Sequence, residues 1–374
     1  MTGISVVVVA WNGEAYIADA LRSTLAQQPR PTVLVVDNAS CDGTVHLALE
    51  LLTGRGSSDE DGQVMVQNQN LGFVAGANRG LEQVLSRKPD DRWTLLLNQD
   101  AALRPGALAA IDRAFSLDPR IGAVGCRILY PDGLTVQHAG GRLELPRLVG
   151  RHLGHGEPVK TAVQPTSAES ATTPVQDVDF VTGAALAIRT EALRQVGLLD
   201  EAFSPGYYED VELCDRLRTA GWRVVYAPDA TVLHHESASF TNRDERLFLA
   251  HRNRYLYAIP RLQDATFRAE FTAAESTFLT NQASFEELRA ACRGALAVAS
   301  RPLLRIEVED SGANHSRSPH LCARVLFDLR SVAVQAIHSR LVDLAQSSVR
   351  LDDQVRHSRS RILALHRNLP PLSV

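Results

Sequence analysis

Four acidic side chains lie within seven residues of the stretch YYEDVELCDRL, positions 207–217: Glu209, Asp210, Glu212 and Asp215. Apolar residues are interspersed with them in a helical pattern, which predicts a helix. Acidic residues near the start of a helix can do no more than complement its macrodipole. They can also form an active site, where carboxylates work with shifted proton affinities. The stretch alone leaves both interpretations open.

Other polar clusters follow predicted buried strands. Asp37 and Asn38 follow the apolar run VLVV, and Asn98, Gln99 and Asp100 follow LLL. An aspartate in the position of Asp37 can accept hydrogen bonds from a nucleotide, although the Asn, Ser, Asp and Gly residues after it also favour a plain turn. Asp100 can provide an oxygen ligand to Mg²⁺ or Mn²⁺ beside a diphosphate, or it can cap the following helix.

The order of the predicted elements places these clusters at one edge of a sheet. Buried strands are predicted at 4–11, 32–40, 63–70, 92–100 and 121–130, with a helix after each of the first four. This alternation predicts an α/β fold with a mostly parallel central sheet flanked by helices. Ligands of such sheets bind outside the carboxyl ends of the strands. Polar clusters fall at four of these ends, which indicates a site for a polar ligand.

The middle of the chain has a different character. Residues 131–178 are rich in Gly, Pro, Ser and Thr, which predicts long loops and a hairpin, with a mobile stretch at 162–175. Residues 223–235 predict one or two further strands. From residue 258 onward the pattern is helical. We therefore expect an α/β domain at 1–257 and a helical C-terminal extension at 258–374.

The extension suggests contacts but does not choose between them. Its apolar residues after position 323 recur at three- and four-residue steps, which fits a helix packed on its own domain or the seam of a homodimer. Residues 356–368 hold four arginines and no acid, which fits a solvated tail or contact with anionic lipid.

Composition limits the class of protein. The chain has 374 residues, is 45% hydrophobic and carries a net charge of −4, so it can build a sizeable core but has no overall field that attracts nucleic acid. Its five cysteines are scattered, which predicts reduced thiols. Neither a signal peptide nor an apolar run of membrane-spanning length is predicted. We expect a cytoplasmic protein whose membrane contact, if present, is peripheral at the inner face.

Five segments occur in an order that is informative as a set: VVVVAWNGEAYIADALRSTLAQ, VVDNASCDGT, NQNLGFVAGANRG, LLLNQD, and the long run from DFVTGAALAIRTEAL through YYEDVELCDRLRTAGW to PDATVLHH. Together they resemble the family 2 glycosyltransferases with the GT-A fold, and especially rhamnosyltransferase-like members. The resemblance covers residues 3–257. Each motif is weak by itself, whereas five in order at consistent spacing are specific.

The resemblance implies roles for particular residues. Asp210 would be the catalytic base, and Glu209 a supporting carboxylate. Asp100 would hold Mg²⁺ or Mn²⁺ although Asn98 replaces the first acid of the family's metal motif, and His234 would be a further ligand unless His235 takes that role. The nucleotide-sugar pocket would be lined by Ala10, Asn12, Asp37, Asn70, Gly72, Asn78, Asn98, Gln99, Gly183 and Ala184.

The function implied is inverting transfer of a sugar from a nucleotide-diphospho-sugar to a hydroxyl of a glycan or lipid-linked glycan. dTDP-rhamnose is the first choice of donor, and UDP-sugars remain open. The alternative is a sugar-nucleotide-binding scaffold without turnover that acts through its C-terminal helices. A nucleotidyltransferase would need a Gly-rich loop with Lys or Arg near the N-terminus, and the first cationic residue here is Arg22.

Overall fold

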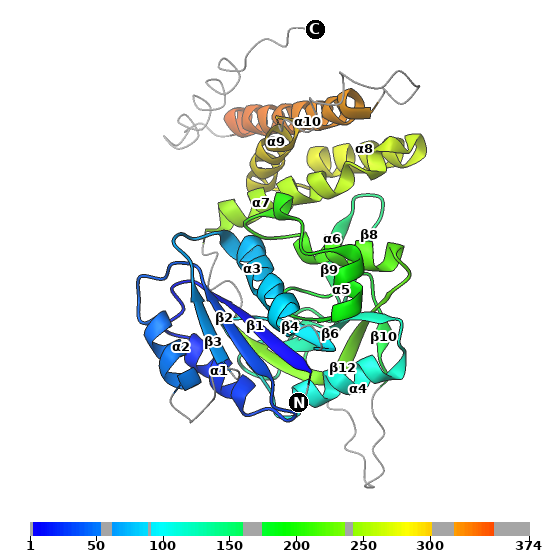
Figure 1. Cartoon of the computed structure of the whole chain (residues 1–374). Helices are drawn as coiled ribbons and strands as arrows, with labels where there is room; N and C mark the ends of the chain where they lie inside the picture. Colours follow the sequence, from blue (N-terminus) through cyan, green and yellow to red (C-terminus); the bar gives the residue numbers. More distant parts are fainter. Residues whose placement is uncertain are drawn as a thin grey trace. The chain divides into compact units, whose positions relative to one another are not determined.

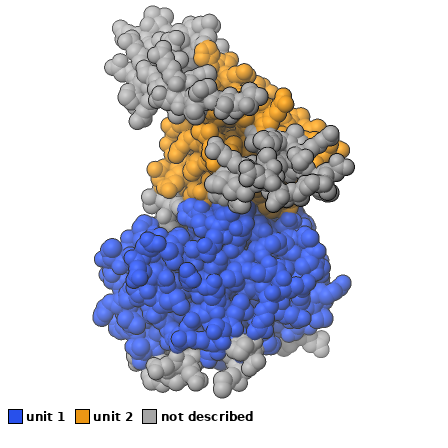
Figure 2. Space-filling model, turned by 45° about the horizontal axis from the view of Figure 1, so that its top comes forward, with its two compact units in different colours: residues 1–241 blue, residues 242–374 orange. Residues whose placement is uncertain are grey.

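The computed structural model of the chain describes residues 3–53, 62–88, 91–159, 174–235, 242–300 and 318–347. The chain forms two compact units, residues 1–241 and 242–374, which Figure 2 colours separately. The first unit contains a central sheet flanked by helices, and the second is helical (Figure 1). The expected α/β fold with a mostly parallel sheet is confirmed.

Strands and helices alternate through the first third of the chain, and shorter strands follow. The elements of the first unit are β1 (Ile4–Ala10), α1 (Ile17–Leu25), β2 (Thr32–Asp37), α2 (Thr44–Thr53), β3 (Gly62–Val66), α3 (Gly72–Arg87), β4 (Trp93–Asn98), β5 (Ala101–Leu103), α4 (Ala107–Leu117), β6 (Ile121–Leu129), β7 (Val136–His138), β8 (Gly141–Glu144), β9 (Val149–His152), β10 (Gln176–Asp177), β11 (Ala185–Arg189), α5 (Thr190–Val196), η1 (Glu201–Phe203), α6 (Glu209–Thr219) and β12 (Arg223–His234).

The large sheet has the strand order β10-β12-β6-β11-β4-β1-β2-β3, with β5 paired to β12 and β7 paired to β6. β1 runs parallel to β2 and β4, and β2 runs parallel to β3. Their carboxyl ends therefore meet at one edge, as expected. β11 departs from this direction, because it runs antiparallel to β4 and β6 and so begins, at Ala185, next to the carboxyl end of β4.

Both faces of β1 are buried, which explains its unbroken run of apolar and β-branched residues. One face, with Val6 and Val8, belongs to a core that α1, α2 and α4 complete. The other face is covered by α3, where Gly80 permits close packing, because a Cβ at this position would lie 2.3 Å from Val7 Cγ1. The helices thus fix the sheet from both sides and leave its carboxyl edge to the connecting loops.

The loop-rich middle contains the predicted hairpin, formed by β8 and β9. The predicted one or two strands at 223–235 are one long strand, β12, with register shifts against β6. The stretch expected to be mobile, 162–175, lies almost entirely outside the described residues.

The second unit contains α7 (Arg243–Ala258), η2 (Arg261–Gln263), α8 (Ala265–Asn281), α9 (Phe285–Ala299) and α10 (Ser318–Ser347). α9 packs on α7 and α10, and α10 also packs on α8. The unit begins before α7, earlier than the boundary expected after residue 257. Among the described helices, none combines the length and apolarity needed to cross a bilayer. The arginine-rich residues 356–368 lie outside the described part.

Candidate active site

The carboxyl ends of β1, β2 and β4 bring together much of the predicted site. Ala10 lies opposite Asp37 in the β1–β2 ladder, and Asn98 ends the neighbouring strand β4. Just beyond Asn98, the buried Gln99 joins β4 to the end of β1. Its Oε1 accepts from the Trp11 N–H (2.9 Å), and its Nε2 donates to the Trp11 carbonyl (3.0 Å). Gln99 therefore braces two strand ends against each other.

The loops after β1 and β2 are joined by a chain of hydrogen bonds. The buried Asp37 carboxylate accepts from the N–H (3.0 Å) and the hydroxyl (2.5 Å) of Ser40. Ser40 Oγ accepts from the Asn12 N–H (2.8 Å), and Asn12 Oδ1 accepts from the Cys41 N–H (2.8 Å). The turn that the sequence allowed is thus present, and it places Asp37 and Asn12 in one loop cluster.

The start of α3 joins the same edge. Asn70 Oδ1 accepts from the Gly72 N–H (2.8 Å), and Asn38 Nδ2 donates to the Gly72 carbonyl (2.9 Å). Gly72 has a φ of +78°, and a Cβ there would lie 2.9 Å from the Cα of Pro205. Only glycine meets both requirements without strain.

Asn78 is different from the other predicted pocket residues. It lies inside α3 and is buried, with Nδ2 donating to the Leu199 carbonyl (2.9 Å) and Oδ1 accepting from the Leu199 N–H (3.0 Å). Its carboxamide is therefore occupied by the segment between α5 and α6. The contacts of this side chain are with that segment and not with the loops after β1 and β2.

His234, at the end of β12, is held in one orientation. Its Nδ1 lies 2.7 Å from Gln137 Oε1, which only accepts, so Nδ1 carries a proton. Its Nε2 lies 3.2 Å from Asn98 Nδ2 and 3.3 Å from Asp100 Oδ1. The imidazole thus turns Nε2 toward both the Asn98 amide and the Asp100 carboxylate.

The neighbouring histidine points to another partner. The ring centroid of His235 lies 5.2 Å from that of Tyr16. The backbone N–H of His235 donates to the Asp100 carbonyl (3.0 Å). Of the two histidines that the sequence left open, His234 is the one whose side chain faces the Asp100 carboxylate. His235 contributes through its backbone.

The donor set suits a hard divalent cation bound together with a ligand. Within the described part of the chain, no three His, Cys, Asp or Glu side chains gather as a metal site. Asp100 and His234 are two donors, which leaves positions that diphosphate and water oxygens can fill. A set of carboxylate, imidazole and phosphate oxygens suits Mn²⁺ as well as Mg²⁺. The residues present therefore fit the expected ion.

The Glu209-Asp210 pair begins α6 and contacts the start of β11. Asp210 Oδ2 accepts from the Gly183 N–H (2.9 Å), and Oδ1 accepts from the Val211 N–H (2.8 Å). Glu209 is buried, and its Oε2 has no hydrogen-bond partner among the described residues. A Cβ at position 183 would lie 3.3 Å from Phe73 Cε1, a tight contact, and 3.6 Å from Glu209 Oε1, an ordinary one, so glycine mainly leaves room for Phe73.

A short series of contacts connects the two halves of the site. Asp210 binds Gly183, and the next residue, Ala184, accepts through its carbonyl from the Asn98 N–H (3.0 Å). Asn98 in turn contacts His234 through its side chain. The antiparallel strand β11 makes this possible, since it begins where β4 ends. The carboxylates of α6 and the Asp100–His234 pair thus lie at one edge of the sheet.

The two carboxylates have different electrostatic surroundings. Burial raises the pKa of Glu209 well above its ordinary range, and the Asp210 carboxylate raises it further. Burial also raises the pKa of Asp210, but the N–H groups of Gly183 and Val211 and the imidazole of His152 oppose that rise. Glu209 therefore holds a proton more readily, and Asp210 is the better-stabilised anion of the pair.

Three supporting residues had no role assigned from the sequence. Gln137 lies in the stretch for which long loops and a hairpin were predicted, yet it orients His234. Tyr207 and Tyr208 have φ of 76° and 70°, which is rare for such side chains and found mainly at functional sites. The Tyr208 hydroxyl donates to the Leu148 carbonyl (2.8 Å) and so joins the β8–β9 hairpin to the start of α6.

The chain is similar to glycosyltransferases along most of its length. The family model described as glycosyltransferase like family 2 matches residues 2–249. An N-acetylglucosaminyl-diphospho-decaprenol L-rhamnosyltransferase of Mycobacterium tuberculosis is 33% identical over 274 residues, which covers 69% of this chain and 84% of that protein. The O-antigen biosynthesis protein RfbC of Myxococcus xanthus is 37% identical over 124 residues, 32% of this chain and 9% of that protein.

Solved structures support the GT-A fold assignment. TarS of S. aureus has a TM-score of 0.51 at 14% identity, over 89% of this chain and 54% of TarS. GalNAc-T7 with UDP, GalNAc and Mn²⁺ has a TM-score of 0.50 at 16% identity, over 72% of this chain and 54% of that chain. The chain thus spans about half of each. These likenesses concern the fold alone, whereas the family model and the rhamnosyltransferase similarity show that the chain is an enzyme of glycosyltransferase family 2.

Proposed function

We propose that the protein is an inverting glycosyltransferase that moves L-rhamnose from dTDP-rhamnose to a hydroxyl of an N-acetylglucosaminyl-diphospho-polyprenol or a similar lipid-linked glycan. Two observations support this proposal. The first is the 33% identity to the M. tuberculosis rhamnosyltransferase, whose name states that acceptor. The second observation supports the reaction and not the substrates: it is the series of contacts from Asp210 through Gly183 and Ala184 to Asn98 and His234.

Asp210 acts as the base in this proposal. It takes the proton of the acceptor hydroxyl while the hydroxyl oxygen attacks the anomeric carbon, and the bond from that carbon to the diphosphate breaks. The Gly183 N–H fixes the orientation of the carboxylate. The raised pKa of Asp210 favours proton acceptance, because a stronger base shares more of the proton in the transition state. Glu209 beside it, which retains its proton more readily, can donate a hydrogen bond to a sugar hydroxyl.

The leaving nucleoside diphosphate is assigned to the opposite half of the site. Asp100 and His234 would hold Mg²⁺ or Mn²⁺, which when bound neutralises the charge that grows on the diphosphate. The loops of Asn12 and Asp37 would receive the nucleoside, and the Asn70–Gly72 turn would complete that pocket. Ala184 and Gly183, both small, leave room for the sugar between the two halves.

The test compares Asp210→Asn with the unmodified enzyme. Transfer should fall about 100- to 10,000-fold in this variant, because removal of a positioned base forfeits its contribution. Binding of dTDP with Mn²⁺, measured by the shift of the melting temperature, should stay within a few fold. Turnover close to normal would remove the base assignment. A larger stabilisation by UDP or GDP than by dTDP would overturn the proposed donor.

The competing proposal is a scaffold that binds a sugar nucleotide without turnover. Its signature would be dTDP-rhamnose binding without release of dTDP or transfer to any prenyl-linked N-acetylglucosamine. The backbone hydrogen bonds that orient Asp210 favour the enzyme, because a scaffold has no need for an aligned carboxylate beside a sugar pocket.

A further inference from the structure

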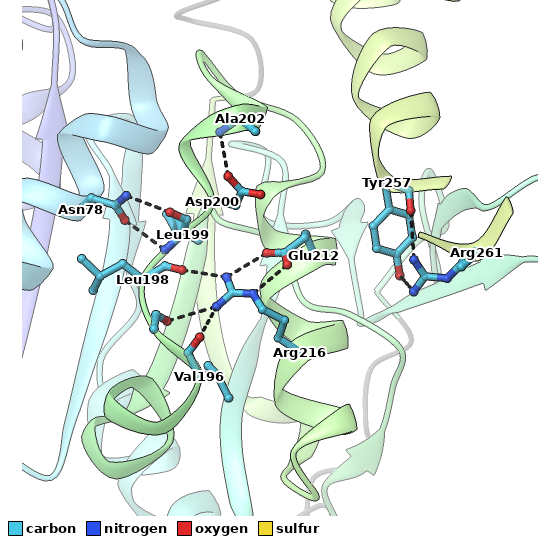
Figure 3. Close-up of polar contacts among 11 residues, drawn as sticks. Asn78, Val196, Leu198, Leu199, Asp200, Ala202, Glu212, Arg216, Tyr257 and Arg261 are labelled. Carbon is cyan, nitrogen blue, oxygen red and sulfur yellow. Dashed lines mark hydrogen bonds and ion pairs between the residues drawn. The ribbon is translucent and has the colours of Figure 1, made fainter. Parts of the chain in front are cut away.

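The segment between α5 and α6, residues 197–208, leads directly into Glu209 and Asp210. It has little regular structure of its own, since only the short η1 turn interrupts it. Side chains from two helices form hydrogen bonds with this α5–α6 segment from either side (Figure 3). One set comes from α6, which carries the proposed base, and the other comes from α3, whose first turn lies at the donor edge.

Arg216 of α6 makes the first set of contacts. Its guanidinium donates to the Val196 carbonyl (2.5 Å) and to the Leu198 carbonyl (2.7 Å). The same group forms a bidentate pair with Glu212, at 2.7 Å and 2.8 Å, one turn earlier on α6. Such a planar, doubly bonded pair holds a guanidinium in one orientation. Arg216 therefore ties the end of α5 rigidly to the helix of Asp210.

The second set comes from α3. Asn78 bonds both backbone groups of Leu199, and both residues are buried, so neither group can turn to water instead. Nearer the donor edge, the Phe73 N–H donates to the Pro205 carbonyl (2.9 Å), beside the close approach of Gly72 to Pro205. The segment is thus fixed to α3 at two places.

We propose that Asn78 and Arg216 are positioning residues that hold Asp210 in register with the donor edge through the α5–α6 segment. The inference rests on the proposed role of Asp210 as the base. α3 begins at the donor edge, where Asn38 binds Gly72, and α6 begins at the acceptor side with Asp210. No direct hydrogen bond among the described residues joins the two helices at these ends, so the segment between them sets their spacing.

The first experiment compares Arg216→Lys with Arg218→Lys on the same helix. Both variants keep the charge, but Arg218 pairs only with Asp215 among the contacts resolved for it. In Arg216→Lys we expect kcat to fall about 10- to 100-fold, because a displacement near 1 Å has this effect on a reacting group. The donor KM and the affinity for dTDP should stay within twofold. Arg218→Lys should keep its kcat.

The pH profile separates positioning from general destabilisation. The hydrogen bond from the Gly183 N–H lowers the pKa of Asp210. A displaced Asp210 loses part of this bond, so its pKa rises, and the acid limb of kcat/KM should move to higher pH in Arg216→Lys. A variant that only unfolds more easily keeps the position of the limb and loses activity in proportion to the folded fraction. That second outcome would overturn the proposal for Arg216.

Asn78→Asp tests the other side with almost no change of shape. It keeps the acceptor for the Leu199 N–H but turns an oxygen toward the Leu199 carbonyl, so kcat should fall with dTDP affinity unchanged. Loss of dTDP binding would mean that Asn78 lines the nucleotide pocket, which overturns its positioning role. Asp210→Asn serves as the reference. If this variant retains turnover, the base assignment fails. If it is inactive while Arg216→Lys and Asn78→Asp have normal turnover, only the positioning role is refuted.

Discussion

Glu209 and Asp210, the adjacent carboxylates at the start of α6, differ in the hydrogen bonds that they make. Asp210 turns toward the Gly183 N–H, whereas Glu209 turns into the protein, where its Oε2 has no partner among the described residues. The sequence showed that acids gather here, and the family resemblance implied which one acts as the base. The residue before them, Tyr208, has a left-handed backbone (φ 70°), which no sequence pattern predicts.

Glu209→Gln tests this difference through stability. Because burial raises the pKa of Glu209 in the folded state, the folded protein keeps a proton that the unfolded chain releases above about pH 4.3. The free energy of unfolding therefore falls as pH rises from that value to the folded-state pKa, by up to about 1.4 kcal/mol per pH unit. Glutamine has no proton to lose, so the melting temperature of the variant relative to wild type should increase across this range and then level off.

The control for this measurement is Glu82→Gln, since Glu82 is half exposed and forms a surface pair with Arg79. Its melting temperature relative to wild type should be nearly independent of pH. A pH-independent offset for Glu209→Gln would mean that Glu209 is ionised in the folded protein.

Gln137 provides a second prediction at the scale of single residues. Its Oε1 fixes the proton of His234 on Nδ1, so Gln137→Ala should reduce Mn²⁺ affinity in the presence of dTDP about 10- to 100-fold. Gln137→Glu retains an oxygen acceptor and should bind Mn²⁺ at least as well as wild type. Titration of Mn²⁺ by calorimetry gives both values. Equal affinity in Gln137→Ala and wild type would show that Gln137 does not support metal binding through His234.

At the scale of elements, the βα alternation was predictable because each strand is a short buried run followed by an amphipathic helix. The carboxyl edge followed from it, and so did Asp37, Asn98 and Asp100 as residues of that edge. The antiparallel direction of β11 was not predictable, because residues 185–189 are equally apolar in either direction. That direction places Gly183 beside Asn98, so the connection between the two halves of the site required the structure.

The β8–β9 hairpin gives a prediction for a whole element. Tyr208→Phe removes the hydroxyl that donates to the buried Leu148 carbonyl and accepts from the Gly150 N–H (3.3 Å). Loss of this bond should destabilise the hairpin by about 1 kcal/mol. Hydrogen exchange of hairpin amides should quicken severalfold while amides of β1 and β2 keep their rates. We expect dTDP affinity to stay the same; slower exchange or unchanged exchange of the hairpin amides would contradict the anchoring role.

At the scale of the whole molecule, the chain divides into two units, and all the proposed site residues belong to the first, residues 1–241. The helical unit has its own buried polar centre. Glu275, fully buried on α8, accepts from the Arg254 guanidinium and from the Tyr255 hydroxyl (2.8 Å). Removing one partner of such a buried pair leaves the other charge uncompensated. The pair therefore links α7 to α8 inside this unit.

Glu275→Ala should distinguish the two units in solution. The change leaves the buried Arg254 charge without its carboxylate, which costs about 3–5 kcal/mol. The residues of 242–300 should then become susceptible to proteases at temperatures where the enzyme is otherwise resistant. Binding of dTDP and Mn²⁺, which we assign to residues of the first unit, should persist in the same sample. Glu270→Ala on the exposed side of α8 should change neither property, because its side chain lies in solvent. If dTDP binding disappeared together with protease resistance in Glu275→Ala, the two units would have to unfold as one, and the donor site would depend on the helices that follow it.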